Sequence, residues 1–238
     1  MRAVIVCAVL AATVGPAHAG RSFYAWLPAT EIVPERGTEI ETWIAEENDE
    51  GDTHLRETLV GAAPVFAATE QLEVAVPFEV VRATEDGLDP LFTLRAFGVE
   101  GRYRFASAAA AIVPFLKFGL ERDVTIRNLG RLKLDPALAF QRGSLHVVAD
   151  AGVIFEANPG GVHLEVRPGA GASYLVSPQV RLGAELHAEL SLDSAGRSWA
   201  AAGPNVAWLR GRSWLVATLG VGVYNVGMAP RIMWGLTL

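Results

Sequence analysis

The sequence predicts an all-β protein, a closed antiparallel transmembrane β-barrel of about 12 strands, with 10 as the alternative count. Three observations lead to this prediction. Apolar and polar residues alternate over many segments that are long enough to cross a membrane at a tilt. Short and long connections alternate between these segments. An aromatic residue stands just before each short connection.

The first 19 residues have the pattern of a secretory signal peptide. Arg2 precedes an apolar run over 3–14, and Ala17-His18-Ala19 places small residues at the two cleavage-specifying positions. The run is too short to cross a hydrocarbon core of roughly 30 Å as a helix. We therefore expect Sec-dependent export and cleavage after Ala19; the alternative is an N-terminal core helix. Cys7, the only cysteine, leaves with the signal, which excludes disulfides and thiol catalysis from the mature chain.

Composition narrows the class of protein. A net charge of -6 argues against a nucleic-acid partner. Hydrophobic residues make up 51% of the chain, yet the longest charge-poor run after the signal, 214–230, contains several glycines and alternates in polarity, so two strands fit it better than a spanning helix. The remaining options are a soluble periplasmic β-protein and a transmembrane barrel, whose apolar residues face lipid from alternate positions.

The clearest alternation runs over 179–192, where leucine, valine and alanine face one side and charged residues, histidine and glycine face the other. No helical face would sort these residues in this way. Counting all such runs gives the expected strands 38–47, 54–66, 70–82, 92–105, 108–120, 131–141, 144–156, 161–174, 179–192, 197–208, 213–224 and 229–238.

The connections between these strands are short at 67–69, 106–107, 142–143, 175–178 and 209–212, and mostly longer elsewhere. Bacterial barrels have short periplasmic turns and longer external loops. The order of short and long connections in this chain therefore fits an even number of strands with both termini in the periplasm. The aromatic residues that precede the short connections are Phe66, Phe105, Phe140, Tyr174 and Trp208. Rings at one depth are typical of a membrane–water interface, whereas a soluble sandwich has no reason to place them at one end.

The last strand carries an apolar alternation that ends on the final residue: Ile232, Trp234, Leu236 and Leu238. It resembles the C-terminal signature of Gram-negative outer-membrane β-barrels, whose members usually end in Phe or Trp. The resemblance implies a porin-like protein of the outer membrane, recognised by the barrel-assembly machinery through these residues, with membrane lipids and lipopolysaccharide around it. The stretch 68–77, with its Glu-Gln-Leu-Glu turn, is also similar to repeats in outer-membrane transporters related to phenol meta-pathway proteins.

We therefore expect three parts: a signal peptide at 1–19, a periplasmic N-terminal lead-in at 20–37 that packs under or into the barrel mouth, and the barrel at 38–238. The inward positions carry charges of both signs, which are expected to pair because an unpaired ion beside a low-dielectric wall is costly. The residues expected to line the lumen are Glu100, Arg102, Arg104, Asp150, His163, Glu165, Arg167, Arg181, Glu185, His187 and Glu189.

The leading hypothesis for function is a channel or transporter for a small-molecule solute. The second is a structural or adhesive barrel whose lumen is blocked by ion pairs. The third is an outer-membrane lipid hydrolase using Ser144 and His146, but these residues point to the interior, whereas hydrolases of that type present them to lipid, and no G-x-S-x-G motif is present. We therefore expect no enzyme activity and no cofactor, and the spacing of His163 and His187 does not predict a metal site.

Overall fold

The computed structural model describes residues 22–34, 36–48, 55–107, 109–193 and 197–238, all in strands or connections. The strands are β1 (Thr38–Asn48), β2 (Arg56–Ala67), β3 (Leu72–Ala75), β4 (Phe78–Thr84), β5 (Leu91–Arg104), β6 (Ile112–Asp123), β7 (Leu129–Arg142), β8 (Leu145–Asn158), β9 (Gly161–Ser177), β10 (Val180–Ser191), β11 (Trp199–Arg210), β12 (Ser213–Thr218), β13 (Val221–Tyr224) and β14 (Arg231–Thr237). Within these residues, no helix is long and apolar enough to span a membrane. The expected signal peptide, 1–19, lies outside the described residues.

Two of the barrel-spanning strands are interrupted. β3 and β4 are separated by Val76 and Pro77, because proline has no N–H to donate to a sheet. β12 and β13 are separated by Leu219 and Gly220. Since each pair continues one crossing of the wall, the fourteen strands form a barrel of 12.

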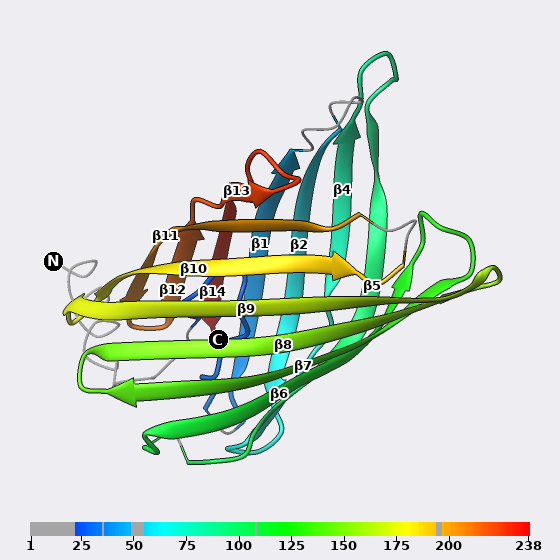
Figure 1. Ribbon diagram of the computed structural model, residues 1–238. Coiled ribbons are helices and arrows are strands. Elements are labelled where there is room, and N and C mark those ends of the chain that lie inside the picture. The colour runs from blue at the N-terminus through cyan, green and yellow to red at the C-terminus, as the bar shows by residue number, and fades with distance from the viewer. Residues whose placement is uncertain (1–21, 35, 49–54, 108, 194–196) are drawn as a thin grey trace, which may run out of the picture.

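The sheet closes on itself between the first and last strands. β1 pairs antiparallel with β2 and also with β14, in a register that sets Glu39 opposite Thr237. The backbone N–H of Leu238 donates to the carbonyl of Thr38 at 2.8 Å. Every other crossing of the wall pairs with the crossings before and after it, and the result is the closed wall seen in Figure 1. The predicted all-β, closed antiparallel barrel of 12 strands is confirmed.

The two ends of the barrel differ. We call one the short-turn end, formed by the connections 68–71, 105–111, 143–144, 178–179 and 211–212, and the other the long-loop end, formed by 49–55, 85–90, 124–128, 159–160, 192–198 and 225–230. One boundary differs from the prediction: β6 begins at Ile112 and not at 108, so the connection expected at 106–107 extends over 105–111. The alanine run in this connection has too weak an alternation to mark where the strand begins.

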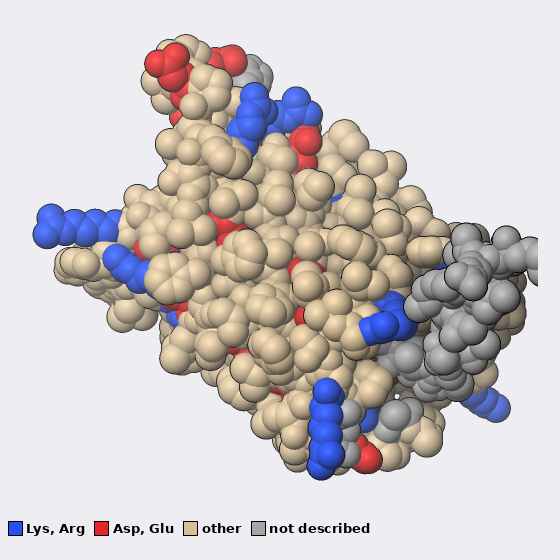
Figure 2. Space-filling model, turned by 180° about the vertical axis from the view of Figure 1, so that it is seen from behind, with Lys and Arg blue, Asp and Glu red and all other residues tan. Residues whose placement is uncertain are grey.

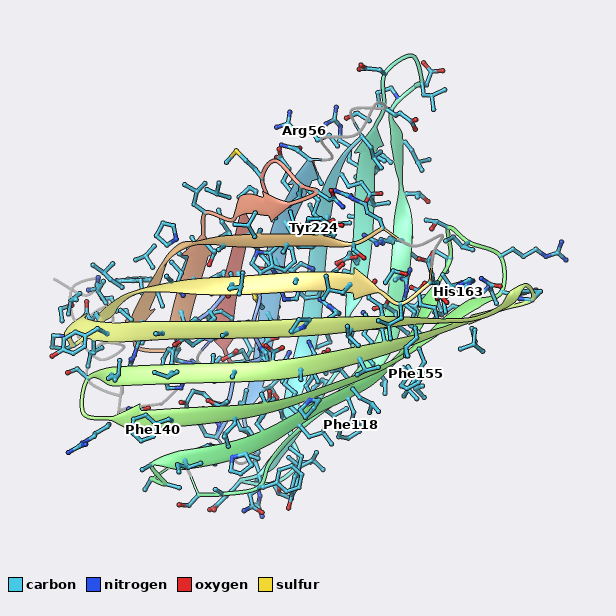
Figure 3. The ribbon with its side chains drawn as sticks, in the orientation of Figure 1. Arg56, Phe118, Phe140, Phe155, His163 and Tyr224 are labelled. Atoms are coloured by element: carbon cyan, nitrogen blue, oxygen red, sulfur yellow. The ribbon has the colours of Figure 1, made fainter. Side chains whose placement is uncertain are left out.

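The wall has an apolar outer face and a polar inner face. Figure 2 shows an exterior that is mostly free of charge between charged rims. Phe118, Phe140 and Phe155 point away from the barrel on β6, β7 and β8 (Figure 3). Arg181, Glu185 and His187 on β10 alternate with the exposed Leu182 and Leu186, as the period of a strand requires.

Candidate functional site: the barrel lumen

The lumen holds part of the chain itself. Residues 22–34, which we call the N-terminal segment, enter the barrel before β1 and fix their backbone to side chains of the wall. The N–H groups of Ala25 and Trp26 donate to the two carboxylate oxygens of Glu185 at 2.8 and 2.9 Å. The N–H of Val33 donates to Glu73 at 2.8 Å. Extended backbone inside a barrel needs such partners, because its own amides pair with no strand.

Aromatic side chains anchor the start of the N-terminal segment. The Tyr24 hydroxyl donates to the carbonyl of His146 at 3.0 Å, and its oxygen lies 3.3 Å from the hydroxyl of Ser173. Burial raises the pKa of Tyr24 to about 12, so the phenol keeps the proton that it donates. The Arg181 guanidinium lies 4.2 Å from the centre of the Phe23 ring, within the range of a cation–π interaction.

Trp26 forms the innermost contact of the N-terminal segment. Its ring stacks on His187 at 5.1 Å between centroids and 14° between planes, and it meets the Trp199 ring edge-on at 5.5 Å between centroids. The Arg231 guanidinium is 4.8 Å from the ring centre. The indole N–H donates to the carbonyl of Ala229 at 3.1 Å. His187, Trp199 and Arg231 lie on β10, β11 and β14, which are close together in the wall, so these contacts hold Trp26 against one side of the lumen.

Glycines on β9 make room for the N-terminal segment. A Cβ atom at Gly171 would lie 2.6 Å from the Tyr24 ring and 2.8 Å from Leu27, and one at Gly169 would lie 2.3 Å from Leu27. Contacts below 3.0 Å do not occur for real Cβ atoms, so the segment can approach β9 only because both positions lack a side chain.

On the opposite wall, Arg102 of β5 is the centre of an ion-pair network. Its guanidinium forms a bidentate pair with Glu41, with both nitrogen–oxygen distances at 2.7 Å, and also pairs with Glu73 at 3.0 Å and Glu100 at 2.8 Å. Lys117 of β6 adds a pair to Glu100 at 3.2 Å. A bidentate guanidinium–carboxylate pair fixes geometry as well as charge, so this network ties β1, β3, β5 and β6 together.

Two further networks lie toward the long-loop end. Arg131 pairs with Glu121 at 3.0 Å and Asp123 at 2.9 Å, and also with Glu156. Arg167 pairs with Glu189 at 3.0 Å, and the Trp199 indole donates to the same carboxylate at 3.2 Å. The interior charges are therefore largely paired, as expected for ions beside a low-dielectric wall.

Open space remains between these networks. An inner cavity of about 250 Å³ runs between Trp26 of the N-terminal segment and the charged wall that includes Arg102 and Arg167. A second cavity of about 420 Å³, which we call the long-loop cavity, lies beside β8–β11 at the long-loop end. The two cavities share Glu47, Glu156, Glu165 and Glu189 in their walls, so they adjoin.

The residues expected to line the lumen take three kinds of position. Glu100, Arg102, Asp150, Glu165, Arg167, His187 and Glu189 line the inner cavity. His163 lies at the long-loop end of β9, where it lines the long-loop cavity and contacts Asp193 at 3.2 Å (Figure 3). Arg104, Arg181 and Glu185 are buried inside the barrel but away from the cavity: Arg104 donates to the carbonyl of Glu70, and the other two hold the N-terminal segment. Whether the cavity-lining residues act on a solute stays a prediction.

Several cavity residues were not among those expected. Arg95 was missed because it is the extra residue of a β-bulge: Glu79 pairs with Ala96 and Val80 with Leu94, so Arg95 faces the lumen beside Ala96 and lies 3.8 Å from Glu79. Strict alternation cannot find such a residue. Glu41 and Glu47 were detectable, since they share the inward parity of Glu39, Trp43 and Ala45 on β1. Lys117 was detectable in the same way, between the outward Leu116 and Phe118.

The residues expected to face the membrane interface and the assembly machinery all point outward. Phe66, Phe105, Phe140, Tyr174 and Trp208 are exposed near the short-turn end. On β14, Ile232 and Trp234 are exposed, Leu236 is partly exposed, and Leu238 follows the strand as the last residue. The roles of these residues in the membrane and in assembly stay predictions.

Of the two candidate catalytic residues, His146 is held by other contacts. His146 is buried, its Nδ1 lies 3.2 Å from the Tyr24 hydroxyl, and its ring packs against Phe23 at 4.9 Å. The neighbouring Ser144 uses its backbone carbonyl to accept from Arg181. Within the described part of the chain, no three His, Cys, Asp or Glu side chains gather into a group that could hold a metal ion.

A closed 12-stranded barrel with an apolar exterior and a charged, partly filled lumen is the architecture of outer-membrane barrels. Solved structures of that class share this fold. An outer membrane channel from Pseudomonas putida F1 is 11% identical over 87% of this chain and 97% of that one, with a TM-score of 0.68. The NanC porin is 9% identical over 84% of this chain and 100% of its own, with a TM-score of 0.57. The translocator domain of the autotransporter NalP from Neisseria meningitidis is 13% identical over 99% of this chain and 95% of that one, with a TM-score of 0.56. No family model and no curated protein sequence matches the chain.

Proposed function

We propose that this protein is an outer-membrane channel that admits small polar solutes along the charged side of its lumen. The observation that carries the proposal is the pair of adjoining cavities, which run beside the N-terminal segment and are walled by charged side chains. Polar walls of this kind can replace the hydration of a solute, which a lumen packed with apolar side chains could not do. The fold shared with a channel and a porin supports the same function.

The exterior supports a location in the outer membrane. Exposed leucine, valine and phenylalanine side chains cover the wall between the charged rims, and hydrocarbon is the environment that satisfies such a surface. We propose that the protein reaches this membrane by Sec export and the barrel-assembly machinery, with Ile232, Trp234, Leu236 and Leu238 as the signal read by that machinery. Its neighbours there would be membrane lipids and lipopolysaccharide.

The alternative is a structural barrel with a blocked lumen. It is favoured by the N-terminal segment, which occupies lumen space beside β9 and β10, and by the dense ion pairs around Arg102. Neither feature fills the two cavities, so we place the channel first. We propose no enzyme activity, since His146 is held by Tyr24 and Phe23.

Two measurements test the proposal. Outer-membrane fractionation and heat-modifiable migration in detergent gels report a folded barrel, and recovery in the soluble periplasmic fraction without detergent would contradict the location. Conductance in planar bilayers tests the path. We expect resolved current steps that change size in a Lys117→Glu variant, which alters a cavity wall. The control Arg127→Glu makes the same change of charge in an exposed loop, and its current steps should keep their size. A folded protein that stays silent at every voltage is a blocked barrel and contradicts the channel.

A further inference from the structure

The long-loop cavity has an unequal set of charges. Four carboxylates line it, from Glu47, Glu156, Glu165 and Glu189, against one guanidinium, from Arg197. Elsewhere in the lumen the signs are nearly balanced, so the inequality is local. A concave space with walls of one sign concentrates ions of the opposite sign. The cavity volume of about 420 Å³ is within the range of small-molecule binding pockets.

Not all four carboxylates are neutralised by neighbours. Glu156 pairs with Arg131, and Glu189 pairs with Arg167 at 3.0 Å. Glu165 reaches Arg167 only at 4.0 Å, and among the described residues Glu47 has no ion pair within that distance. Glu47 on β1 and Glu165 on β9 are therefore the carboxylates of this cavity without a close ion pair: Arg95 and Arg197 attract Glu47, and Arg167 and Arg131 attract Glu165, but Glu189 repels both.

Aromatic and imidazole groups complete the surroundings. Trp199 lines the same cavity, and an indole ring attracts cations through its π-face. His187 lies beside it, at 5.6 Å between ring centroids, and is buried at 3% exposure. Its Nε2 faces Glu189 at 3.5 Å, whereas its Nδ1 has no hydrogen-bond partner among the described residues. The tautomer that donates from Nε2 leaves Nδ1 as an acceptor for a ligand N–H.

We propose that the long-loop cavity binds a small organic cation, a solute with a protonated amine, between Glu47, Glu165 and the Trp199 ring. The ammonium group would meet the two carboxylates that have no close ion pair, its hydrocarbon part would lie against the indole, and the unpaired Nδ1 of His187 is the next acceptor toward the inner cavity. This assignment rests on the proposed channel function, for which it names the class of solute.

The test is direct binding to the folded full-length mature protein in detergent, measured by titration calorimetry and tryptophan fluorescence with n-butylammonium chloride as probe. Sodium butyrate, with a chain of the same length and the opposite charge, is the control ligand. We expect saturable binding of n-butylammonium that weakens with added KCl, and no saturable binding of butyrate. Binding should weaken about tenfold or more in Glu47→Gln/Glu165→Gln, because a carboxylate in a partly desolvated cavity attracts a cation more strongly than one in bulk water.

The matched control is Asp86→Asn/Asp89→Asn, which removes the same charge from an exposed loop at the same end of the barrel. It should bind n-butylammonium as the parent does. Heat-modifiable migration verifies the fold of each variant. If the double variant does not fold, the single variant Glu165→Gln tests the site, with an expected loss of affinity of about threefold.

Equal binding of both probes, or unchanged affinity in the folded Glu-to-Gln variants, would overturn the cation site. The two proposals fail separately. A protein that conducts but does not bind n-butylammonium is a channel without this site, whereas one that binds the probe but never conducts has the site and is no channel.

Discussion

The N-terminal segment should leave the lumen more readily when its innermost contact is removed. In a Trp26→Ala variant, the segment loses the stack on His187, the cation–π contact with Arg231 and the hydrogen bond to Ala229. Contacts of these kinds contribute roughly 0.5–1.5, 0.5–2 and 0.5–1.5 kcal/mol respectively. The docked state should therefore lose about 1.5–5 kcal/mol relative to the released state, which shifts the equilibrium roughly 10- to 5000-fold.

Cysteine labelling measures this equilibrium directly. Because Cys7 in the expected signal peptide is the only cysteine, a Ser22→Cys substitution gives the mature chain a single thiol. Ser22 is buried at the edge of the inner cavity, so a maleimide should reach the thiol much faster when the segment is released. The labelling rate should rise with the released fraction, by about the factor given above, when Trp26→Ala is added to Ser22→Cys.

The matched control removes an indole from the other face of the wall. Trp234 is exposed on the exterior and donates to Ser213, with no contact to the N-terminal segment. Trp234→Ala should leave the labelling of Ser22→Cys unchanged. Equal labelling rates in Ser22→Cys with and without Trp26→Ala would refute the reasoning, because the segment would then be held by contacts other than those of Trp26.

Two further variants test the interior and the exterior of the wall. Arg102→Met removes the cation shared by three carboxylates and leaves buried charges unpaired, which should lower the stability of the folded barrel by about 3–5 kcal/mol. The loss is measured as a lower temperature of the gel-mobility transition. Arg56→Met, at an exposed ion pair, should lower the stability by about 0–1 kcal/mol. Leu186→Arg, on the outer face at the middle of β10, should lower the free energy of unfolding by about 2–4 kcal/mol, measured by urea unfolding from lipid vesicles. Val162→Arg, near the end of β9, should lower it by about 0–1 kcal/mol. Equal losses would argue against a lipid-facing wall.

Most of the wall could be predicted from the sequence, since a strand between lipid and a polar lumen must alternate. The predicted strand over 161–174 corresponds to β9, and its inward and outward residues are as expected. The prediction fails where the backbone departs from period two. At the bulge on β5, Arg95 takes the inward direction that alternation assigns to its neighbour, and before β6 the small residues of 106–111 have no polarity contrast to mark the start of the strand.

The contacts inside the lumen could not be predicted in the same way. The N-terminal segment has no periodicity, so nothing in its own sequence indicates that Ala25 and Trp26 donate to Glu185, a residue far along the chain. The partners of Arg102 are set by which strands face each other across the lumen, and the order of residues along one strand does not contain that information.

The inward positions nevertheless contain a pattern that explains where the N-terminal segment lies. On β9 they change at mid-strand from large and charged (His163, Glu165, Arg167) to small (Gly169, Gly171, Ser173), and on β7 from Arg131, Lys133 and Asp135 to Ala137 and Ala139. In both strands the small residues lie toward the short-turn end, where Tyr24 and Leu27 of the segment pack. Small residues on the inner face of a wall leave space in the lumen. If that space stayed empty, the residues around it would lose dispersion contacts, so its filling by another part of the chain is favourable. The segment supplies Tyr24 and Leu27 to that volume. The charged half has side chains long enough to reach one another, so a change from charged to small inward residues along a barrel strand indicates where another part of the chain packs against the wall.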